Sequence, residues 1–435
     1  MSEIISAEKK ISAIREFDQL VTAYNAGQFP LKISGVHGSL TAFILKEIFK
    51  IKINKTLVVA PTDREAAELQ IDLSALGVPC SLFPGWGTVP YRDLPLISGV
   101  FAERSKVLSG LCITGNASEI IVTSERAFLT PVPPVEYTKK LIFTITKGDK
   151  LDTISLSKTL SEYGWTRVQR VQMPGEFVLH GEVMDMLLGT NNEAYRIVLD
   201  FDTVESIKRF DPADQSSIEQ VDHFSIYPLK EFFWTDDLID TLNSNLAQMP
   251  EFKDGGKKTI ECLIQERKIV GEENLFPLAF KKSASIADYL ENGDIVFLDR
   301  ERLENSQEIL EKEYLNLFRN ALRERCVPAP SHLLLNFNDL ASNVKRCISF
   351  LSIRNNLSDS ININSSPAKS FFGNINFMKE EFTTLLENGW KIVIAAHSEV
   401  QAVRLAELLK DLPDIQIIIA QLSQGFSVNA VKFIL

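Results

Sequence analysis

Short apolar segments alternate with helical patterns in the first part of the chain, and this alternation limits the folds that it can adopt. The segments LKISG (31–35), KTLVVAP (55–61), VPCSLFP (78–84) and EIIVTS (119–124) are strongly apolar, as buried strands are. Stretches with helical spacing lie between them. Parallel strands require such crossovers, so the pattern predicts right-handed βαβ units and a parallel sheet.

The length and composition are those of a multidomain globular chain. Its 435 residues correspond to roughly two to four domains, and 45% of them are apolar and 24% charged. The net charge of −11 argues against a dominant non-specific grip on nucleic acid, which needs clustered lysine and arginine. A local basic patch is still compatible with this charge.

The cysteines and the N-terminal stretch indicate the compartment. Five cysteines lie far apart with no C-x-x-C pair, which favours buried free thiols in a reducing compartment over disulfides or a metal site. Residues 1–17 are too charged for a signal peptide, and the chain has no run of 18 apolar residues. We therefore expect a cytoplasmic protein with no membrane partner.

The sequence pattern changes near residue 139, where strand-like segments with short polar connections replace the alternation. Residues 194–201 and 204–210 are predicted to form a hairpin around Asp202 and Thr203. After residue 229 helical and mixed patterns return, which indicates an inserted domain. The expected organisation is an α/β domain at 1–138 and 229–354, an inserted β-rich (α+β) domain at 139–228, an Asn/Ser-rich linker at 355–370 and a small α/β domain at 371–435.

The small domain shows a compact βαβ pattern, with strands at KIVIAA (391–396) and IQIIIA (415–420). The chain then ends on AVKFIL (430–435), an apolar strand with nothing after it. An uncovered apolar terminus is unusual, so we expect the natural protein to continue beyond this point.

The segment SGVHGSLTAF (34–43) has the layout of a phosphate-binding P-loop without its working residues. With Gly35 as the first glycine of G-x-x-x-x-G-K-[ST], the second falls on Leu40, the lysine on Thr41 and the hydroxyl on Ala42, while Gly38 lies inside the loop. Hydrogen bonds to charged groups contribute roughly 1.5–3 kcal/mol each, so these losses remove several kcal/mol of nucleotide binding. The apolar strands also lack the paired carboxylates of a Walker-B strand. We expect a strand–turn–helix unit that binds no cofactor.

Two further segments contain residues that could contact a partner. In FPGWGTVPYRDLP, Trp86 and Tyr91 either pack within a long loop, the more common outcome, or lie exposed to a partner. In QMPGEFVLHGEVMDM, His180 has no paired base or nucleophile, so solvation is favoured over catalysis. Asp185 is expected in a loop or at a cap.

Taken together, these stretches resemble the N-terminal region of bacterial transcription-repair coupling factors, the Mfd family. The resemblance is dense over about residues 30–230 and looser over 365–430. Its marks, in order, are SGVHGSLTAF, LVVAPTDREAAELQIDL, LFPGWGTVPYRDLP, FAERSKVLSGL, IIVTSERAFLTPVPP, GWTRVQRVQMPGEFVLHGEVMDML, YRIVLDFDTVESIKRFDPADQSS, SFFGNINF and LSQGF.

The resemblance implies a module similar to the damage-recognition protein UvrB. Such a module has a helicase-like α/β domain stripped of its ATP site, an inserted β-rich domain that binds UvrA, and a small α/β domain. It also implies that the RNA-polymerase-binding domain and the two DNA-translocase motor domains, which use ATP and Mg²⁺, come later in the full-length protein. RNA polymerase and double-stranded DNA would be partners of those later domains.

The resemblance carries Arg167, Phe177 and His180 over as contact positions for UvrA. His180 stands where many relatives have arginine, which implies a less basic interface. Arg170 is added because it lies three residues after Arg167 and could form a small basic patch with it, although solvated surface charge is an equal alternative.

Two classes of function follow from these observations. The leading hypothesis is a non-catalytic adaptor that recruits UvrA of nucleotide excision repair to RNA polymerase stalled at DNA damage. The alternative is an ATP-dependent DNA-remodelling or DNA-binding domain acting in its own right. The residues at Thr41 and Ala42 argue against the ATPase, and the acidic balance argues against DNA binding.

Overall fold

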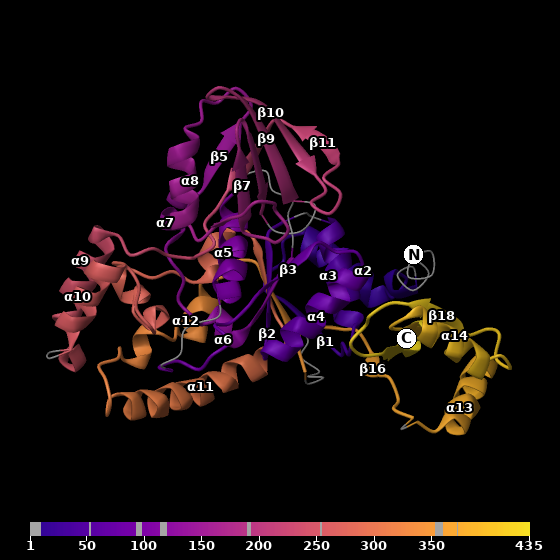
Figure 1. Cartoon of the computed structure of the whole chain (residues 1–435). Coiled ribbons are helices and arrows are strands. Elements are labelled where there is room, and N and C mark those ends of the chain that lie inside the picture. Colours follow the sequence, from indigo (N-terminus) through magenta and orange to yellow (C-terminus); the bar gives the residue numbers. More distant parts are fainter. Residues whose placement is uncertain are drawn as a thin grey trace.

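The computed structural model describes residues 10–51, 54–92, 98–113, 120–188, 193–252, 255–352, 360–371 and 373–435. Figure 1 shows a central sheet with its helices, a β-rich domain that stands on one side of it, and a small α/β domain formed by the C-terminal residues. This arrangement confirms the predicted fold class: a parallel-sheet α/β domain, an inserted β-rich domain and a small α/β domain.

The central sheet has seven strands in the order β15-β1-β14-β13-β2-β4-β3, and all neighbouring strands are parallel. β13 and β14 lie between β1 and β2, so segments on both sides of the inserted domain build one sheet. The strands are β1 (Leu31–Ser34), β2 (Thr56–Ala60), β3 (Cys80–Phe83), β4 (Ile120–Ser124), β13 (Asp294–Phe297), β14 (Cys347–Leu351) and β15 (Ile361–Asn362).

Helices cover both faces of this sheet. The first core holds residues of α2, α3 and α4 with Val58 and Ala60 of β2, and the second holds residues of α5, α6, α11 and α12 with Leu57 and Val59. β2 has the sequence TLVVA and is buried on both faces, which requires a continuous run of apolar residues. The helices are α2 (Arg15–Asn25), α3 (Leu40–Ile51), α4 (Asp63–Ala75), α5 (Ser98–Cys112), α6 (Glu125–Phe128), α7 (Val135–Leu141), α11 (Arg300–Ala321) and α12 (Phe337–Ser342).

A helical extension lies beside the central sheet and packs on its own aromatic cluster. Phe232 and Phe276 stack at its centre with ring centroids 4.4 Å apart. The extension and the neighbouring short turns consist of α9 (Asp236–Leu246), α10 (Gly256–Glu266) and the 3₁₀ helices η2 (Pro250–Phe252), η3 (Glu272–Asn274), η4 (Phe276–Ala279), η5 (Ile286–Leu290) and η6 (Pro330–His332).

The inserted domain is a six-stranded sheet in the order β11-β10-β9-β8-β7-β6, with α8 and the β5–β12 ribbon packed on one face. All pairs in this sheet are antiparallel except β6 with β7. Its elements are β5 (Phe143–Thr146), α8 (Thr153–Glu162), β6 (Thr166–Arg167), β7 (Glu176–His180), β8 (Val183–Leu187), β9 (Ala194–Asp200), β10 (Thr203–Phe210), β11 (Ser217–Val221) and β12 (His223–Ile226).

Both connections of the inserted domain lie at one end. β5 begins at Phe143, which pairs with Ile226 at the end of β12. The turns at 147–152, 181–182 and 201–202 therefore gather at the opposite end, where the amide of Leu151 bonds the Asp202 carbonyl and the amide of Leu199 bonds the Glu182 carbonyl. We call this end, away from the central sheet, the distal end.

The hairpin predicted around Asp202 and Thr203 forms, but its turn is shifted by one residue. Asp200 pairs with Thr203, so Phe201 and Asp202 are the turn residues. Phe201 has a φ of +56°. A bulky L side chain rarely adopts this backbone conformation, so sequence preferences do not indicate Phe201 as a turn residue.

The C-terminal domain has five strands in the order β16-β19-β20-β17-β18. The predicted βαβ unit is present, because β17 and β18 are parallel and α14 connects them. The elements are β16 (Ser365–Pro367), α13 (Ile375–Glu387), β17 (Lys391–Ala396), α14 (Glu399–Leu408), β18 (Gln416–Ile419), β19 (Phe426–Val428), η7 (Asn429–Val431) and β20 (Phe433–Ile434).

The expected linker and the premise of an uncovered apolar terminus both need correction. The segment 355–370, expected as a linker, contains β15 and β16, and Ile363 between them is 1% exposed; residues 353–359 lie outside the described residues. The apolar segment at the end of the chain is covered, because β20 pairs with β17 and β19 and Phe433 is 0% exposed. The polar composition of residues 355–370 gave no sign of β15 and β16. The cover over β20 includes pairing with β17, a strand distant in the sequence, which local patterns do not show.

The five cysteines form no disulfide with one another; Cys347 is buried and the other four are partly exposed. None of the helices in the described residues is both long and apolar enough to cross a membrane.

A buried ion pair ties α5 to the segment where the chain leaves the inserted domain. The side chains of Arg104 and Glu231 are both 0% exposed, and the Arg104 Nε donates to a Glu231 carboxylate oxygen. The guanidinium also lies 4.2 Å from the Phe83 ring centroid and 4.0 Å from that of Trp86. Burial raises the pKa of the Glu231 carboxyl, and the Arg104 charge opposes that rise.

The residue after Arg104 completes this attachment. The Ser105 hydroxyl donates to the carbonyls of Pro228 (2.6 Å) and Lys230 (3.1 Å). The end of the inserted domain is thus attached to α5 by the Ser105 hydrogen bonds to two backbone carbonyls as well as by the Arg104–Glu231 ion pair.

We predict that Arg104→Met lowers the stability of the chain by about 3–5 kcal/mol, because it leaves the Glu231 carboxylate buried without its partner. Chemical denaturation followed by tryptophan fluorescence measures the change. Arg64→Met, which removes an exposed i,i+4 ion pair with Glu68, is the control and should have little effect. Equal stabilities of the two variants would show that the buried pair is dispensable.

Candidate docking surface and degenerate phosphate-binding loop

The loop after β1 has the turn of a phosphate-binding loop but a different chemical lining. Gly35 and Gly38 adopt φ values of +71° and +57°, and α3 begins at Leu40. The predicted strand–turn–helix unit is therefore present. The side chains of Leu40 and Ala42 are 0% exposed and pack in the first core, so they are structural residues at positions where phosphate and Mg²⁺ ligands would be needed.

A loop of the C-terminal domain fills the space in front of this turn. The amide of Ser39 donates to the Gln424 carbonyl at 3.0 Å, and the amide of Gln424 donates to the Ser39 hydroxyl at 3.4 Å. A Cβ added to Gly38 would lie 2.6 Å from the Gly425 carbonyl oxygen. The helix N-terminus, which in a P-loop faces an anion, here faces a backbone carbonyl of the same chain.

Asp72 of α4 holds the filling loop in place. Its carboxylate accepts hydrogen bonds from the Ser423 amide (2.6 Å) and the Ser423 hydroxyl (2.8 Å). Burial raises the pKa of the Asp72 carboxyl, and the hydrogen bonds from Ser423 oppose that rise. A negative side chain next to the turn is a further obstacle to a phosphate group.

The first half of the turn is closed by the segment after β15. The Ser365 amide and hydroxyl both donate to the Gly35 carbonyl, at 3.0 and 2.7 Å, and His37 Nδ1 lies 3.2 Å from the Ser365 hydroxyl. The sequence pattern did not identify Ser39, Asp72 or Gln424 as partners, because their contacts join segments more than 350 residues apart.

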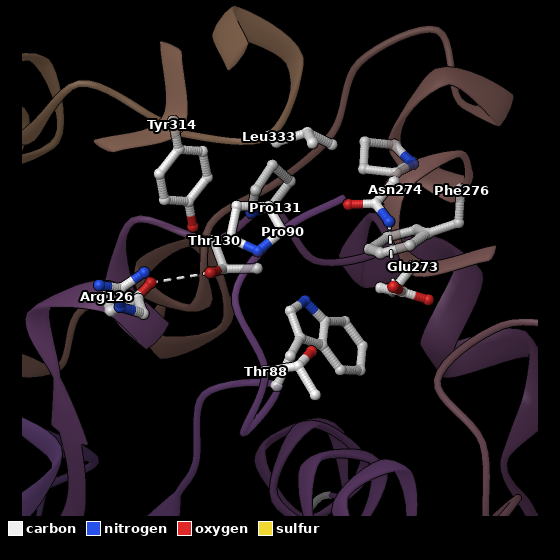
Figure 2. Close-up of a pocket in the computed structure, with 12 residues that line it drawn as sticks. Thr88, Pro90, Arg126, Thr130, Pro131, Glu273, Asn274, Phe276, Tyr314 and Leu333 are labelled. Carbon is white, nitrogen blue, oxygen red and sulfur yellow. Dashed lines mark hydrogen bonds between the residues drawn. The ribbon is translucent and has the colours of Figure 1, made fainter. Parts of the chain in front are cut away.

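A small hollow beside the FPGWG loop is not a ligand site (Figure 2). Its cavity volume is 30 Å³, enough for about one water molecule. Trp86 and Arg126 line it, with Glu273 and Asn274 joined by a 3.0 Å hydrogen bond at one side. Burial raises the pKa of Glu273 to about 7. Across the described ranges, no group of three or more His, Cys, Asp or Glu side chains is arranged to hold a metal ion.

The aromatic residues of that loop pack within the protein. Tyr91 is 6% exposed and donates its hydroxyl to the Pro328 carbonyl at 2.9 Å. Trp86 packs on Arg104 and Phe101. Of the two alternatives for Trp86 and Tyr91, the structure therefore supports packing within the protein over contact with a partner.

The structure places two of the predicted contact residues at one edge of the inserted sheet. Arg167 lies in edge strand β6 and donates to the Leu179 carbonyl at 3.4 Å, and His180 Nε2 lies 3.4 Å from the Gln169 carbonyl. Arg170 lies in the loop after β6 and donates to the Ala213 carbonyl at 3.0 Å, in the turn between β10 and β11. All three side chains are exposed. We call Arg167, His180 and the loop residue Arg170 the basic edge.

Phe177 is the exception. Its side chain is 0% exposed and packs with Met184 and Met186 under α8. The expectation that this ring contacts a partner is therefore wrong for the folded chain. Sequence alternation assigned Phe177 and His180 correctly to opposite faces of β7 but could not show that α8 covers the Phe177 face.

The other face of the inserted sheet, which carries His180, holds an ion pair that the sequence pattern missed. Arg196 of β9 donates through Nε and Nη2 to both oxygens of Asp185, each at 2.8 Å, and its guanidinium lies 4.7 Å from the Phe210 ring centroid. Asp185 was expected in a loop or at a cap, but it lies within β8. The pair fixes the surface next to the basic edge in one geometry.

Comparison with known proteins agrees with this architecture. Residues 143–232 match the family model of the UvrB interaction domain, which coincides with the inserted domain. The chain is 28% identical over 405 residues to the transcription-repair-coupling factor of Borreliella burgdorferi, covering 92% of this chain and 35% of that protein. It is 26% identical over 332 residues to the factor of Bacillus subtilis (71% and 28%) and 30% identical over 251 residues to that of Rickettsia bellii (57% and 22%).

The chain thus spans about a third or less of the length of these relatives. The matches extend on both sides of the inserted domain and agree with the sequence marks described above. The chain is thus similar to transcription-repair-coupling factors over most of its length and carries a UvrB interaction domain at residues 143–232.

Proposed function

We propose that this chain is the non-catalytic adaptor portion of a transcription-repair coupling factor and that it docks UvrA through the inserted domain. The observation that carries the proposal is the match of residues 143–232 to the UvrB interaction domain. This domain stands clear of the central sheet and presents the basic edge to solvent. In the full-length protein, this docking would recruit excision repair to RNA polymerase stalled at a lesion.

The charge distribution supports a protein partner for the basic edge. The guanidinium groups of Arg167 and Arg170 and the imidazole of His180 are exposed on one domain of a chain with a net charge of −11. Opposite potentials on two proteins speed their encounter and set their orientation. An acidic patch on UvrA is the complement that this edge would recognise.

The filled phosphate-binding loop supports a non-catalytic role. Ser39 and Gly38 are in contact with the backbone at Gln424 and Gly425, and Leu40 and Ala42 are core residues. We propose that ATP and Mg²⁺ act only in later motor domains of a longer protein, where RNA polymerase and double-stranded DNA would also bind. A cytoplasmic location follows from these partners.

We predict that Arg167→Ala combined with Arg170→Ala weakens binding to purified UvrA about tenfold or more, since both charges face the partner. Biolayer interferometry with the full chain measures the dissociation constant. Lys257→Ala with Lys258→Ala removes the same charge from exposed positions on α10, outside the inserted domain, and serves as the control. Unchanged binding by the arginine variant would mean that UvrA uses another surface.

The second candidate, an ATP-dependent domain acting in its own right, is tested at Thr41. We predict no saturable binding of a fluorescent ATP analogue at millimolar Mg²⁺, either by the natural chain or by Thr41→Lys. That variant restores the missing lysine at a partly exposed position, but the Ser39 amide is still bonded to Gln424. Saturable binding by the natural chain would establish an active nucleotide site and defeat the adaptor proposal for this domain.

A further inference from the structure

Phe201 is an aromatic side chain placed in solvent. It is 87% exposed, the highest value among the large apolar side chains of the described residues. Exposed single apolar residues are common on proteins and need no explanation by themselves. Phe201 differs from the other exposed apolar residues in its backbone conformation.

The turn that carries Phe201 would be more stable with another residue. Asp200 pairs with Thr203, so Phe201 is the first central residue of a two-residue hairpin turn, with a φ of +56°. Glycine and asparagine adopt this conformation readily, whereas a bulky L residue is strained there. The chain therefore bears a backbone cost to hold an exposed ring, a combination that points to a binding role.

The position of the ring is that of a contact residue. Phe201 lies at the distal end of the inserted domain, opposite the connections at Phe143 and Ile226, so no other described part of the chain stands in front of that end. It belongs to the turn between β9 and β10, closed by the pairs Asp200 with Thr203 and Leu199 with Val204, before a bulge between Val204 and Ser206. A ring on a turn closed by paired strands loses less freedom on binding than a ring on an open loop.

The surroundings of the ring select the kind of partner. Three exposed carboxylates lie on the same group of turns, at Glu182, Asp200 and Asp202. Lys150 pairs with Asp202 at 3.6 Å, with both side chains largely exposed. Excess negative charge at this end disfavours phosphate backbones and anionic lipid surfaces. It favours a protein with an apolar pocket and a basic rim.

The ring and the basic edge fit within one docking surface. His180 pairs with Val183, Val183 pairs with Val198, and Phe201 follows Val198 by three residues. Strand geometry separates His180 and Phe201 by about 10 Å along the strands and about 10 Å across them. An interface of ordinary size, about 800 Å² on each partner, covers both.

We infer that Phe201 is the aromatic anchor of the docking surface and that its ring enters an apolar pocket with a basic rim on UvrA. The inference rests on the proposed function. It assigns to the exposed Phe201 the aromatic contact with UvrA that the buried Phe177 cannot make. Aromatic residues at the centre of an interface commonly carry much of the binding energy.

The test compares the natural full chain with Phe201→Asn and Ile218→Asn for binding to purified UvrA. Asparagine suits the turn, so Phe201→Asn removes the ring without disturbing the hairpin. Ile218 is 51% exposed on β11, near the end of β10 away from the turn, and provides a matched loss of an exposed apolar side chain. We expect Phe201→Asn to raise the dissociation constant at least tenfold with an unchanged or higher melting temperature, and Ile218→Asn to stay within twofold.

The outcomes separate this inference from the function on which it rests. If the natural chain binds UvrA and Phe201→Asn binds equally well, the inference fails and the adaptor function stands. A clear fall in melting temperature for Phe201→Asn would show a structural residue and would also overturn the inference. No binding of UvrA by the natural chain would defeat both.

Discussion

The contact between the central domain and the C-terminal domain depends on the hydrogen bond from the Ser39 amide to the Gln424 carbonyl. This bond uses an amide at the N-terminus of α3, where a phosphate-binding loop would bind an anion. The bond also joins residues 385 positions apart, and together with Asp72 and Ser423 it attaches the C-terminal domain to the central domain. A turn suited to anion binding has become an interdomain contact.

The residues around the turn pack in the core or against the C-terminal domain. Leu40 and Ala42 pack in the first core, and the absence of a Cβ on Gly38 permits the close approach of the Gly425 carbonyl. The central domain is then a rigid support. Arg104 and Ser105 hold the exit of the inserted domain against α5, so the distal end lies away from the central sheet, and the side chains of the basic edge are exposed.

Local patterns in the sequence predicted much of this fold. The apolar runs at β1, β2 and β4 predicted the parallel sheet. The hydroxyls of Thr62 and Ser398 accept hydrogen bonds from the amides of Glu65 and Gln401 three residues later, which is a local feature of the same kind. Apolar strand patterns and helix caps depend on residues close in the sequence. The loss of P-loop residues at Leu40, Thr41 and Ala42 could also be seen there.

Features that depend on distant pairing could not be predicted. Period-two alternation shows that Phe177 and His180 point to opposite faces but not that α8 covers one of them. The ion pair of Asp185 and Arg196 requires the β8–β9 register, and the filling loop requires the packing of whole domains. Phe201 was missed for another reason: local turn preferences favour Asp202 and Thr203, and the structure departs from them.

Hydrogen exchange at the phosphate-loop turn tests the central claim most directly. The account predicts that the Ser39 amide exchanges slowly in the full chain without any nucleotide and that millimolar ATP with Mg²⁺ leaves its rate unchanged, because Gln424 already accepts its hydrogen bond. Fast exchange at Ser39 that slows when ATP is added would show an open phosphate site and would contradict the account.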